Sequence, residues 1–379
     1  MRRYHIILLI LIALIGFIFV PAGCAAPLIE SDGTGTITQE YQSEWNNENT
    51  NSDAPASGAA ETFPVTICDD AGNEVTIPAA PERIVSLSPS NTEILYALGL
   101  GDRIVAVTDH SDYPEEAGEK PSVGGFSSAS IEKILAAQPD LVVTSRGNAA
   151  ELKEKLNGAG LTVIELDPAT IEDVLSDIVM VGRATGTAQN AEELISDMSG
   201  RLATIKEKTE ELSYVPTVAQ VICVTPVYVS GRDTLQNEVV RAAGGTNVFE
   251  DQVEGWGILG TESIISAQPD YIIASSGSGM GTTGSDVIFD FFSSKPVFQQ
   301  IPAVKNNHIC VVNADLISRG GPRIIDAVEE VAGILHPTLF PEFAPVETAT
   351  ASGSQSAGME PFIVPLSLLV IACCIRKIS

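Results

Sequence analysis

The chain repeats one stretch of its sequence 130 residues further along, and this repeat limits the folds that it can adopt. Residues 131–145 read IEKILAAQPDLVVTS, and residues 261–275 read TESIISAQPDYIIAS. Each copy predicts a short helix, a stop at Gln-Pro-Asp and a buried strand. Solenoid repeats recur every ~20 to 50 residues, so two copies at this larger separation predict two lobes of similar construction.

The segment 82–109 predicts that each lobe is an α/β unit. Residues 83–87 form a β-branched run, residues 94–98 place apolar side chains at helical spacing, and residues 104–108 predict a second strand. Strands that alternate with helices predict a Rossmann-like lobe with a parallel sheet, whose ligands bind at the carboxyl ends of the strands. We therefore expect residues 88–91 and 109–114 to face a cleft.

A long helix is expected between the lobes. Residues 187–212 carry an apolar stripe at helical spacing, Thr187 is a suitable cap, and about 25 helical residues span about 37 Å. The expected order is an N-terminal lobe at 63–186 that opens with a hairpin, a bridging helix at 187–212 and a C-terminal lobe at 213–341.

Both ends of the chain predict segments outside the lobes. Residues 1–24 have the layout of a secretory signal, and their Ala-Gly-Cys ending resembles a lipoprotein processing site at Cys24. Pro21 departs from that pattern, so simple cleavage and an uncleaved anchor are alternatives. Residues 25–62 predict a disordered tether. A flexible spacer at 342–358 precedes a hydrophobic segment at 359–379, which resembles the sorting tails of archaeal surface proteins and has a buried helix as its alternative.

The formal net charge of −28, with 21 Lys and Arg against 49 Asp and Glu, argues against nucleic acid as a partner. It suits a domain held off an anionic surface, anchored to the outer face of the cell membrane.

Four alternative functions can be compared with the sequence. Residues 279–284 match GxGxxG but lack the later acidic residue that a dinucleotide site needs. A zinc or manganese site would require convergent ligands, and His110, His308 and His336 are the histidines outside the signal. The chain has no nucleophile elbow, phosphate-binding loop or HExxH helix, which favours a binding protein over an enzyme. A purely adhesive protein would lack a ligand-sized cleft.

Together these features resemble the helix-strutted, class III substrate-binding proteins of ABC importers that take up cobalamin, iron-siderophores or haem. The likeness covers residues 63–341 and is strongest to the cobalamin-binding member. Its motifs lie at residues 83–109, 111–114, 123–145, 229–249 and 321–323. It implies a corrinoid ligand, or an iron-siderophore or haem as the alternative, with no intrinsic cofactor. The implied partners are a permease and its ATPase subunits.

The resemblance also implies a set of ligand contacts. Phe126, Tyr228 and Trp256 would supply apolar faces, whereas Asp315 and Arg319 would be polar clamps on one helix face. For Phe126 and Trp256 the alternative is an ordinary core position. Two further cleft positions depart from the family, since they hold His110 and Ser145 in place of aromatic residues. His110 would approach a metal centre, hydrogen-bond an amide or pack in its loop, and Ser145 would weaken the binding of a macrocycle.

Glu132 and Glu262 occupy equivalent points of the repeat, each in the first turn of a predicted helix. In the family, one exposed glutamate on each lobe docks into arginine pockets of the permease, and two separated carboxylates would fix its orientation. The alternative is the ordinary preference for acidic residues at a helix start.

Overall fold

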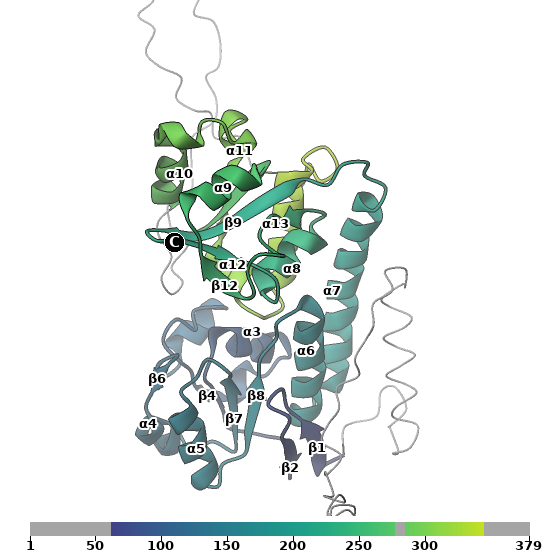
Figure 1. Ribbon diagram of the computed structural model, residues 1–379. Helices are drawn as coiled ribbons and strands as arrows, with labels where there is room; N and C mark the ends of the chain where they lie inside the picture. Colours follow the sequence, from purple (N-terminus) through teal and green to yellow (C-terminus); the bar gives the residue numbers. More distant parts are fainter. Residues whose placement is uncertain (1–61, 277–284, 345–379) are drawn as a thin grey trace, which may run out of the picture. The chain divides into compact units, whose positions relative to one another are not determined.

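The computed structural model describes residues 62–276 and 285–344 of the chain, and Figure 1 shows their arrangement. The described residues belong to one compact unit that ends at Ala344. Within it, each of two lobes is built around its own sheet, as the repeat predicts. The following predictions lie outside the described residues: the signal at 1–24 with Cys24, the tether up to residue 61, the 279–284 motif, and the segments after 344.

The N-terminal lobe has the predicted hairpin and the predicted parallel sheet. Its strands follow the order β4-β3-β7-β8 and all pair in parallel. The elements are β1 (Val65–Cys68), β2 (Glu74–Ile77), β3 (Ile84–Ser86), α3 (Pro89–Ala97), β4 (Ile104–Ala106), β5 (Gly124–Gly125), β6 (Ser128–Ala129), α4 (Ile131–Ala136), β7 (Leu141–Ser145), α5 (Ala150–Gly158), β8 (Val163–Leu166) and α6 (Ile171–Thr185).

The C-terminal lobe has a mixed sheet, so the prediction of a purely parallel sheet is wrong here. The order is β12-β10-β9-β13-β14, and β10 runs antiparallel to both of its neighbours. A two-residue turn at Thr225-Pro226 returns the chain beside β9, which only an antiparallel pair allows. The elements are β9 (Thr217–Val224), β10 (Val227–Ser230), α8 (Leu235–Ala242), β11 (Thr246–Asn247), β12 (Trp256–Ile258), α9 (Thr261–Ala267), β13 (Tyr271–Ser276), α10 (Ser285–Ser294), α11 (Pro302–Lys305), β14 (Ile309–Asn313), α12 (Ala314–Ser318) and α13 (Ile324–Leu335).

The two copies of the repeat are built alike in backbone and side chains. The glutamine of each Gln-Pro-Asp motif ends its helix in the left-handed conformation, with φ of 49° and 47°. The Asp140 carboxylate accepts the backbone N–H of Arg83 at 2.9 Å, and that of Asp270 accepts the backbone N–H of Thr217 at 2.9 Å. In each lobe the aspartate of the repeat therefore forms a hydrogen bond to the start of the neighbouring strand, β3 in the first lobe and β9 in the second.

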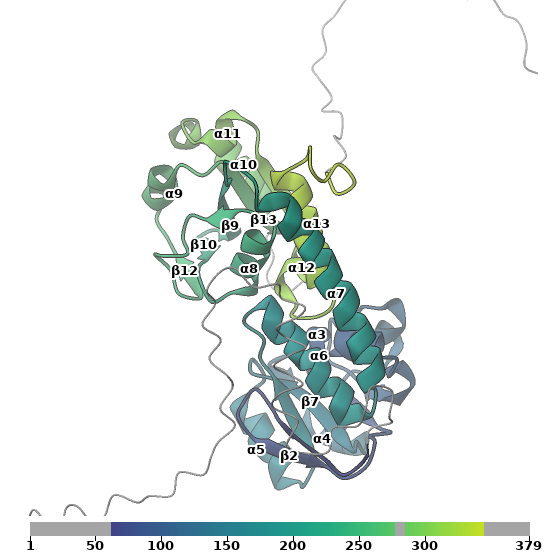
Figure 2. The ribbon, with the colours of Figure 1, turned by 90° about the vertical axis from the view of Figure 1, so that its right-hand side faces the viewer.

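The bridging helix α7 spans Ala188–Thr209, three residues shorter than predicted at its end, and its 22 residues rise about 33 Å. Thr187 precedes it without a capping hydrogen bond, because its hydroxyl pairs with Thr185 at 2.9 Å instead. The helix packs on α6 and on α13 (Figure 2). In the N-terminal lobe Asn190 Nδ2 donates to the Leu98 carbonyl at 2.9 Å.

On the C-terminal side, Arg201 of α7 donates to Asp326 at 2.6 Å and to Glu329 at 2.8 Å, both on α13. Met198 and Ile205 of α7 are buried in an apolar core that draws residues from both lobes. The bridging helix is thus packed into the molecule along its length. Among the described helices, none is long and apolar enough to cross a membrane.

Candidate functional site

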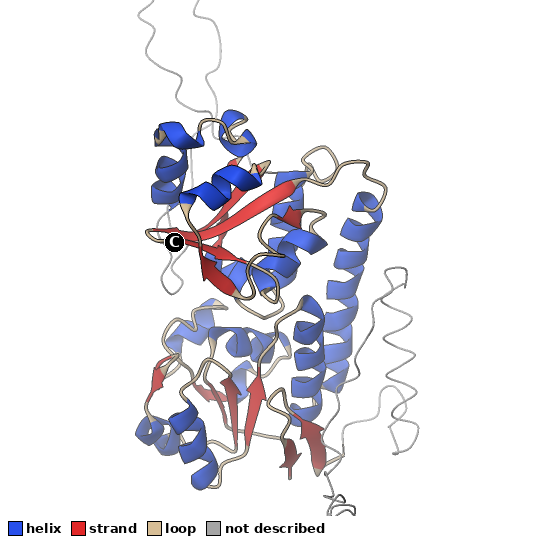
Figure 3. Ribbon diagram, viewed as in Figure 1, coloured by secondary structure: helices blue, strands red, loops and turns tan. Residues whose placement is uncertain are grey.

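The carboxyl ends of the parallel strands in both lobes lie at one junction between the lobes (Figure 3). Strand β14 leads into α12, and Arg319 directly after α12 reaches Glu93 of α3, which follows β3. Each sheet therefore turns the ends of its parallel strands towards the other lobe, which is where such sheets place their ligands.

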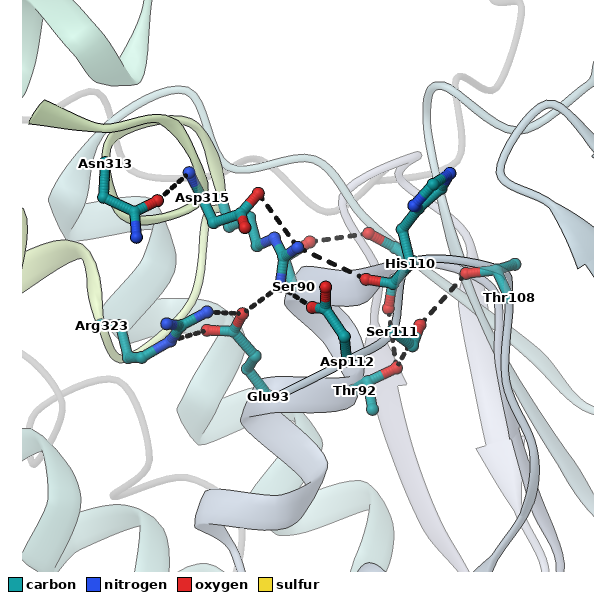
Figure 4. A network of polar contacts seen from close by, with 12 residues as sticks. Ser90, Thr92, Glu93, Thr108, His110, Ser111, Asp112, Asn313, Asp315 and Arg323 are labelled. Carbon is teal, nitrogen blue, oxygen red and sulfur yellow. Dashed lines mark hydrogen bonds and ion pairs between the residues drawn. The ribbon is translucent and has the colours of Figure 1, made fainter. Parts of the chain in front are cut away.

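A network of buried hydroxyl groups fixes the N-terminal side of this junction. The Thr92 hydroxyl lies 2.8 Å from that of Ser86 and 3.2 Å from that of Ser111. Ser111 also pairs with Thr108 at 3.2 Å, and Figure 4 shows Thr92, Ser111 and Thr108 together. These bonds hold the loop after β4 against the first turn of α3. His110 in that loop has φ of 66°, a left-handed conformation that costs a residue with a side chain free energy.

The expectation that all of residues 88–91 face a cleft is wrong for Ser88 and Asn91, which are buried. Pro89 opens α3, so Ser88 is the residue before the helix and Asn91 lies in its first turn. The Asn91 amide donates to the Thr144 carbonyl at the end of β7, at 2.9 Å. Asn91 therefore has a structural role inside the lobe, where its side chain joins α3 to β7.

Five charged side chains from both lobes form an interlobe cluster, which consists of Glu93, Asp112, Asp315, Arg319 and Arg323 (Figure 4). Arg319 Nη1 lies 2.9 Å from Glu93 and 3.0 Å from Asp112, and its Nη2 lies 3.1 Å from Asp315. Arg319 Nη2 also donates to the His110 carbonyl at 3.3 Å. Asp315 and Arg319 therefore contact each other, but they do not share the expected helix face, because α12 ends at Ser318 and Arg319 is extended.

Arg323 also binds Glu93, through two of its guanidinium nitrogens. Its Nε donates to Glu93 Oε2 at 2.9 Å and its Nη2 to Oε1 at 2.5 Å. The Tyr113 ring covers the guanidinium at 3.7 Å. Because the Glu93 side chain is only 2 % exposed, these are charge-assisted bonds in a largely water-free setting.

The surroundings keep both guanidiniums charged. Burial acts to lower the pKa of Arg319, but the hydrogen bond that Arg319 donates to Glu93 and the negative charge of Asp315 outweigh it and raise that pKa. The pKa of Arg323 is raised in the same way, with burial opposed by Glu93. Three carboxylates thus face two permanently charged arginines, and the cluster carries a net negative charge.

Phe126 and Ser145 lie together on the N-terminal lobe. Phe126 is at the tip of the β5–β6 hairpin and is half-buried, with its ring so close over Gly147 that a Cβ there would lie 2.4 Å from the ring. The buried Asn148 joins the two, since its Nδ2 donates to the Phe126 carbonyl at 2.6 Å and its Oδ1 accepts the Ser145 N–H at 2.7 Å. Asn148 therefore positions the Phe126 loop at the end of β7.

Tyr228 and Trp256 share one face of the antiparallel β10–β12 pair. Tyr228 is opposite Ile258 and Ser230 is opposite Trp256, which places these side chains on the same side of the sheet. Val229 on the other side is fully buried, whereas Trp256 is 51 % exposed and Ile258 is 65 % exposed. Trp256 is thus a surface residue on an edge strand and not a core aromatic.

The structure brings the predicted ligand residues into three groups: His110 with Asp315 and Arg319, Phe126 with Ser145, and Tyr228 with Trp256. The His110 imidazole is exposed and points away from the cluster (Figure 4). Glu93, Asp112 and Arg323 were missed as site residues. The motif at 321–323 was a signal for Arg323, but helical periodicity places Glu93 among the apolar residues of α3 and says nothing of its partners.

Glu132 and Glu262 both lie in the first turn of a helix, α4 and α9, and both are exposed. Ser130 donates to the Glu132 carboxylate at 2.7 Å, and this bond lowers the pKa of Glu132. A Cβ on Gly260 would lie 2.8 Å from the Glu262 carboxylate, so this side chain also turns back towards its helix start. The two glutamates are equivalent in structure as in sequence.

Two surface pockets lie away from these groups. One of about 350 Å³ is lined by residues such as Tyr214, Asp270 and His308 in the C-terminal lobe. The other, of about 640 Å³, lies beside α3 and includes Tyr96, Asp102 and Lys120. Among residues 62–276 and 285–344, no group of three or more His, Cys, Asp or Glu side chains could hold a metal ion.

Comparison with known proteins shows what the chain resembles. Residues 84–316 match the model of a family described as periplasmic binding protein. An uncharacterized ABC transporter substrate-binding lipoprotein of Bacillus subtilis is 36 % identical over 297 residues, covering 76 % of this chain and 91 % of that protein. A vitamin B12-binding protein of Vibrio parahaemolyticus is 32 % identical over 258 residues, covering 66 % and 88 %. The periplasmic heme-binding protein RhuT of Roseiflexus, solved in its apo form, superposes with a TM-score of 0.61 at 26 % identity, covering 68 % and 99 %.

Proposed function

The chain belongs to the periplasmic binding protein family and is the substrate-binding protein of an ABC transporter, and from this premise we propose that its ligand is a corrinoid of the cobalamin type. Its relatives are binding proteins, so it is not an enzyme. The proposed site is the junction between the lobes. There Phe126, Tyr228 and Trp256 offer apolar faces, and the interlobe cluster with the His110 loop offers polar groups.

The observation that carries this proposal is the charge balance of the junction. Besides the two arginines of the interlobe cluster, two others lie next to proposed contact residues, and each is paired: Arg146 with Asp167 at 2.9 Å and Arg232 with Glu254 at 2.6 Å. These two pairs are exposed and weak, but the buried pairs of the interlobe cluster are not, so a ligand with several carboxylates would meet a net negative cluster whose arginines are already paired. A macrocycle fringed with neutral amides would instead find hydrogen-bond partners.

This balance favours a corrinoid over haem, whose two propionates are anionic, and over ferric catecholates. A ferric hydroxamate without net charge is the second candidate, since it satisfies the same electrostatic condition. The exposed Trp256 and Ile258 support a ligand with a large apolar face, because exposed apolar surface of this kind marks binding sites. At the position of Ser145 a ring is missing, so this site would hold a corrinoid with one stacking face fewer.

We further propose that Glu132 and Glu262 dock the loaded protein on its permease, whose ATPase subunits supply the energy. Each carboxylate is exposed and held at a helix start on its own lobe, which suits two arginine pockets a fixed distance apart. The protein would act outside the cell membrane, held by its N-terminal or C-terminal segment.

The test is to incubate the purified protein with cyanocobalamin, haem and a ferric hydroxamate, to desalt it, and to record visible absorption. We expect retention of cyanocobalamin in a one-to-one ratio, lost in a Trp256→Ala variant that keeps its circular dichroism spectrum. Retention of haem or of the hydroxamate without cyanocobalamin would overturn the corrinoid assignment.

A further inference from the structure

We propose that Glu93 is a specificity-determining residue, which withholds the guanidinium groups of Arg319 and Arg323 from anionic ligands by holding both across the junction between the lobes. This inference rests on the proposed site, but it concerns the charge of the ligand and not the identity of the macrocycle. The family resemblance gives Glu93 no role, and the proposal follows from its contacts.

Glu93 has the contacts that such a role requires. Its carboxylate accepts three hydrogen bonds from two arginines, at 2.5, 2.9 and 2.9 Å. Its side chain is 2 % exposed, whereas Asp112, the other carboxylate that the N-terminal lobe offers to Arg319, is 48 % exposed. Water screens Asp112 but barely reaches Glu93, so Glu93 is the stronger of the two carboxylates that the N-terminal lobe offers to Arg319, and it is also the carboxylate that pairs with Arg323.

The backbone around the two arginines leaves them little freedom to turn elsewhere. Arg319 caps α12 and Arg323 caps α13, with two glycines and a proline between them. A Cβ on Gly320 would lie 2.6 Å from Pro168, and one on Gly321 would lie 3.4 Å from the Ser90 carbonyl. The loop is therefore pressed against the N-terminal lobe, and both guanidiniums stay beside Glu93.

Neutralising Glu93 removes one of the three negative charges of the interlobe cluster. In Glu93→Gln, two guanidiniums face the two carboxylates of Asp112 and Asp315, and Arg323 keeps the Tyr113 ring but loses its carboxylate. Arg323 then becomes available to a propionate or catecholate oxygen. Arg323→Gln has the opposite effect, because it leaves three carboxylates facing one arginine.

The experiment measures dissociation constants of the whole protein for haem, as an anionic probe, and for cyanocobalamin and a ferric hydroxamate, as neutral probes. Since a desolvated charge pair is worth about a tenfold change or more, we expect Glu93→Gln to favour haem over the neutral probes by about tenfold relative to the unmodified protein. Arg323→Gln should move the ratio about as far in the other direction, which keeps the test valid if Glu93→Gln fails to fold. The control Glu151→Gln, which neutralises an exposed carboxylate on α5 outside the interlobe cluster, should leave the ratio unchanged.

The outcomes separate this inference from the corrinoid proposal. If cyanocobalamin does not bind but the ratio of haem to ferric hydroxamate shifts as described, the corrinoid proposal fails and the role of Glu93 stands. Equal weakening of all probes in Glu93→Gln would reduce Glu93 to a structural residue and overturn the inference. Failure of every variant to bind any probe would overturn both.

Discussion

Replacing Asp177 with asparagine is expected to stabilise the protein, and to do so more strongly as the pH rises. Asp177 lies in α6 and is fully buried, and neither of its carboxylate oxygens has a hydrogen-bond donor among the described residues. Burial, followed by the negative charge of Asp70, raises its pKa from 3.8 to about 10. When protonated, Asp177 can donate to Asp70, whose carboxylate also accepts the backbone N–H of Asp167.

The size of the effect follows from proton linkage. Between about pH 4 and pH 10 the folded state holds one proton more on Asp177 than the unfolded state does. The free energy of unfolding therefore falls as the pH rises, by about 1.4 kcal/mol per unit, which amounts to at most about 4 kcal/mol at pH 7. Asparagine has nearly the same shape and does not titrate, so Asp177→Asn removes this loss.

Urea unfolding followed by far-UV circular dichroism at pH 5, 6, 7 and 8 measures the difference. We expect the gain in Asp177→Asn over the unmodified protein to be small at pH 5 and to grow to about 1 to 4 kcal/mol at pH 7. Glu151→Gln, which removes an exposed carboxylate on α5, serves as the control and should show no such trend. A gain that is the same at every pH would refute the argument, because it would mean that Asp177 binds no extra proton on folding.

Two further predictions concern ligand binding and docking. Gly147→Ala should weaken cobalamin binding by about tenfold in calorimetry, because the new Cβ would lie 2.4 Å from the Phe126 ring and displace it. Gly118→Ala is the control, since a Cβ there would have nothing within 4 Å. Equal affinities of the two variants would argue against a role for Phe126. Charge reversal in the double variant Glu132→Lys, Glu262→Lys should abolish uptake into cells while the affinity for ligand stays unchanged, with Glu151→Lys as the control. Normal uptake by the double variant would remove the docking assignment.

The sequence predicted the elements that local patterns encode. The repeat at 131–145 and 261–275 fixed two equivalent helix–strand units, because Gln-Pro ends a helix wherever it occurs. The same reasoning failed at residues 217–230. The stretch is rich in valine on both sides of Thr225-Pro226, and this turn lacks the Asn-Gly or Asp-Gly signal that marks a two-residue hairpin. The antiparallel strand β10, which carries Tyr228, was missed for that reason.

The candidate site was predictable only in part, for a different physical reason. The spacing of Asp315 and Arg319 is a local property, and the short separation lets the two side chains meet although Arg319 lies one residue past the end of α12. The bond between Arg319 and Glu93 joins residues 226 positions apart, and Glu93 is one of five buried residues in α3, polar and apolar, that the sequence does not tell apart by partner. No periodicity identifies such a pair, since its existence depends on how the two lobes are placed. The burial of Asp177 could not be predicted either, because an acidic residue in α6 is expected on the exposed side of the helix.

The two connections between the lobes have a consequence for how selectivity arises. The helix α7 is packed against both lobes, and the interlobe cluster joins them a second time through a carboxylate that is almost inaccessible to water. Separating the lobes at the cluster would expose Glu93 and two arginines without their partners, which is costly for groups buried in this way. A ligand at the junction therefore meets an arrangement of charge that exists before it binds, and little is left for a closing movement to adjust. If the proposed site and the proposed role of Glu93 hold, ligands of similar size would be distinguished by their peripheral charge, because Glu93 disfavours anionic groups.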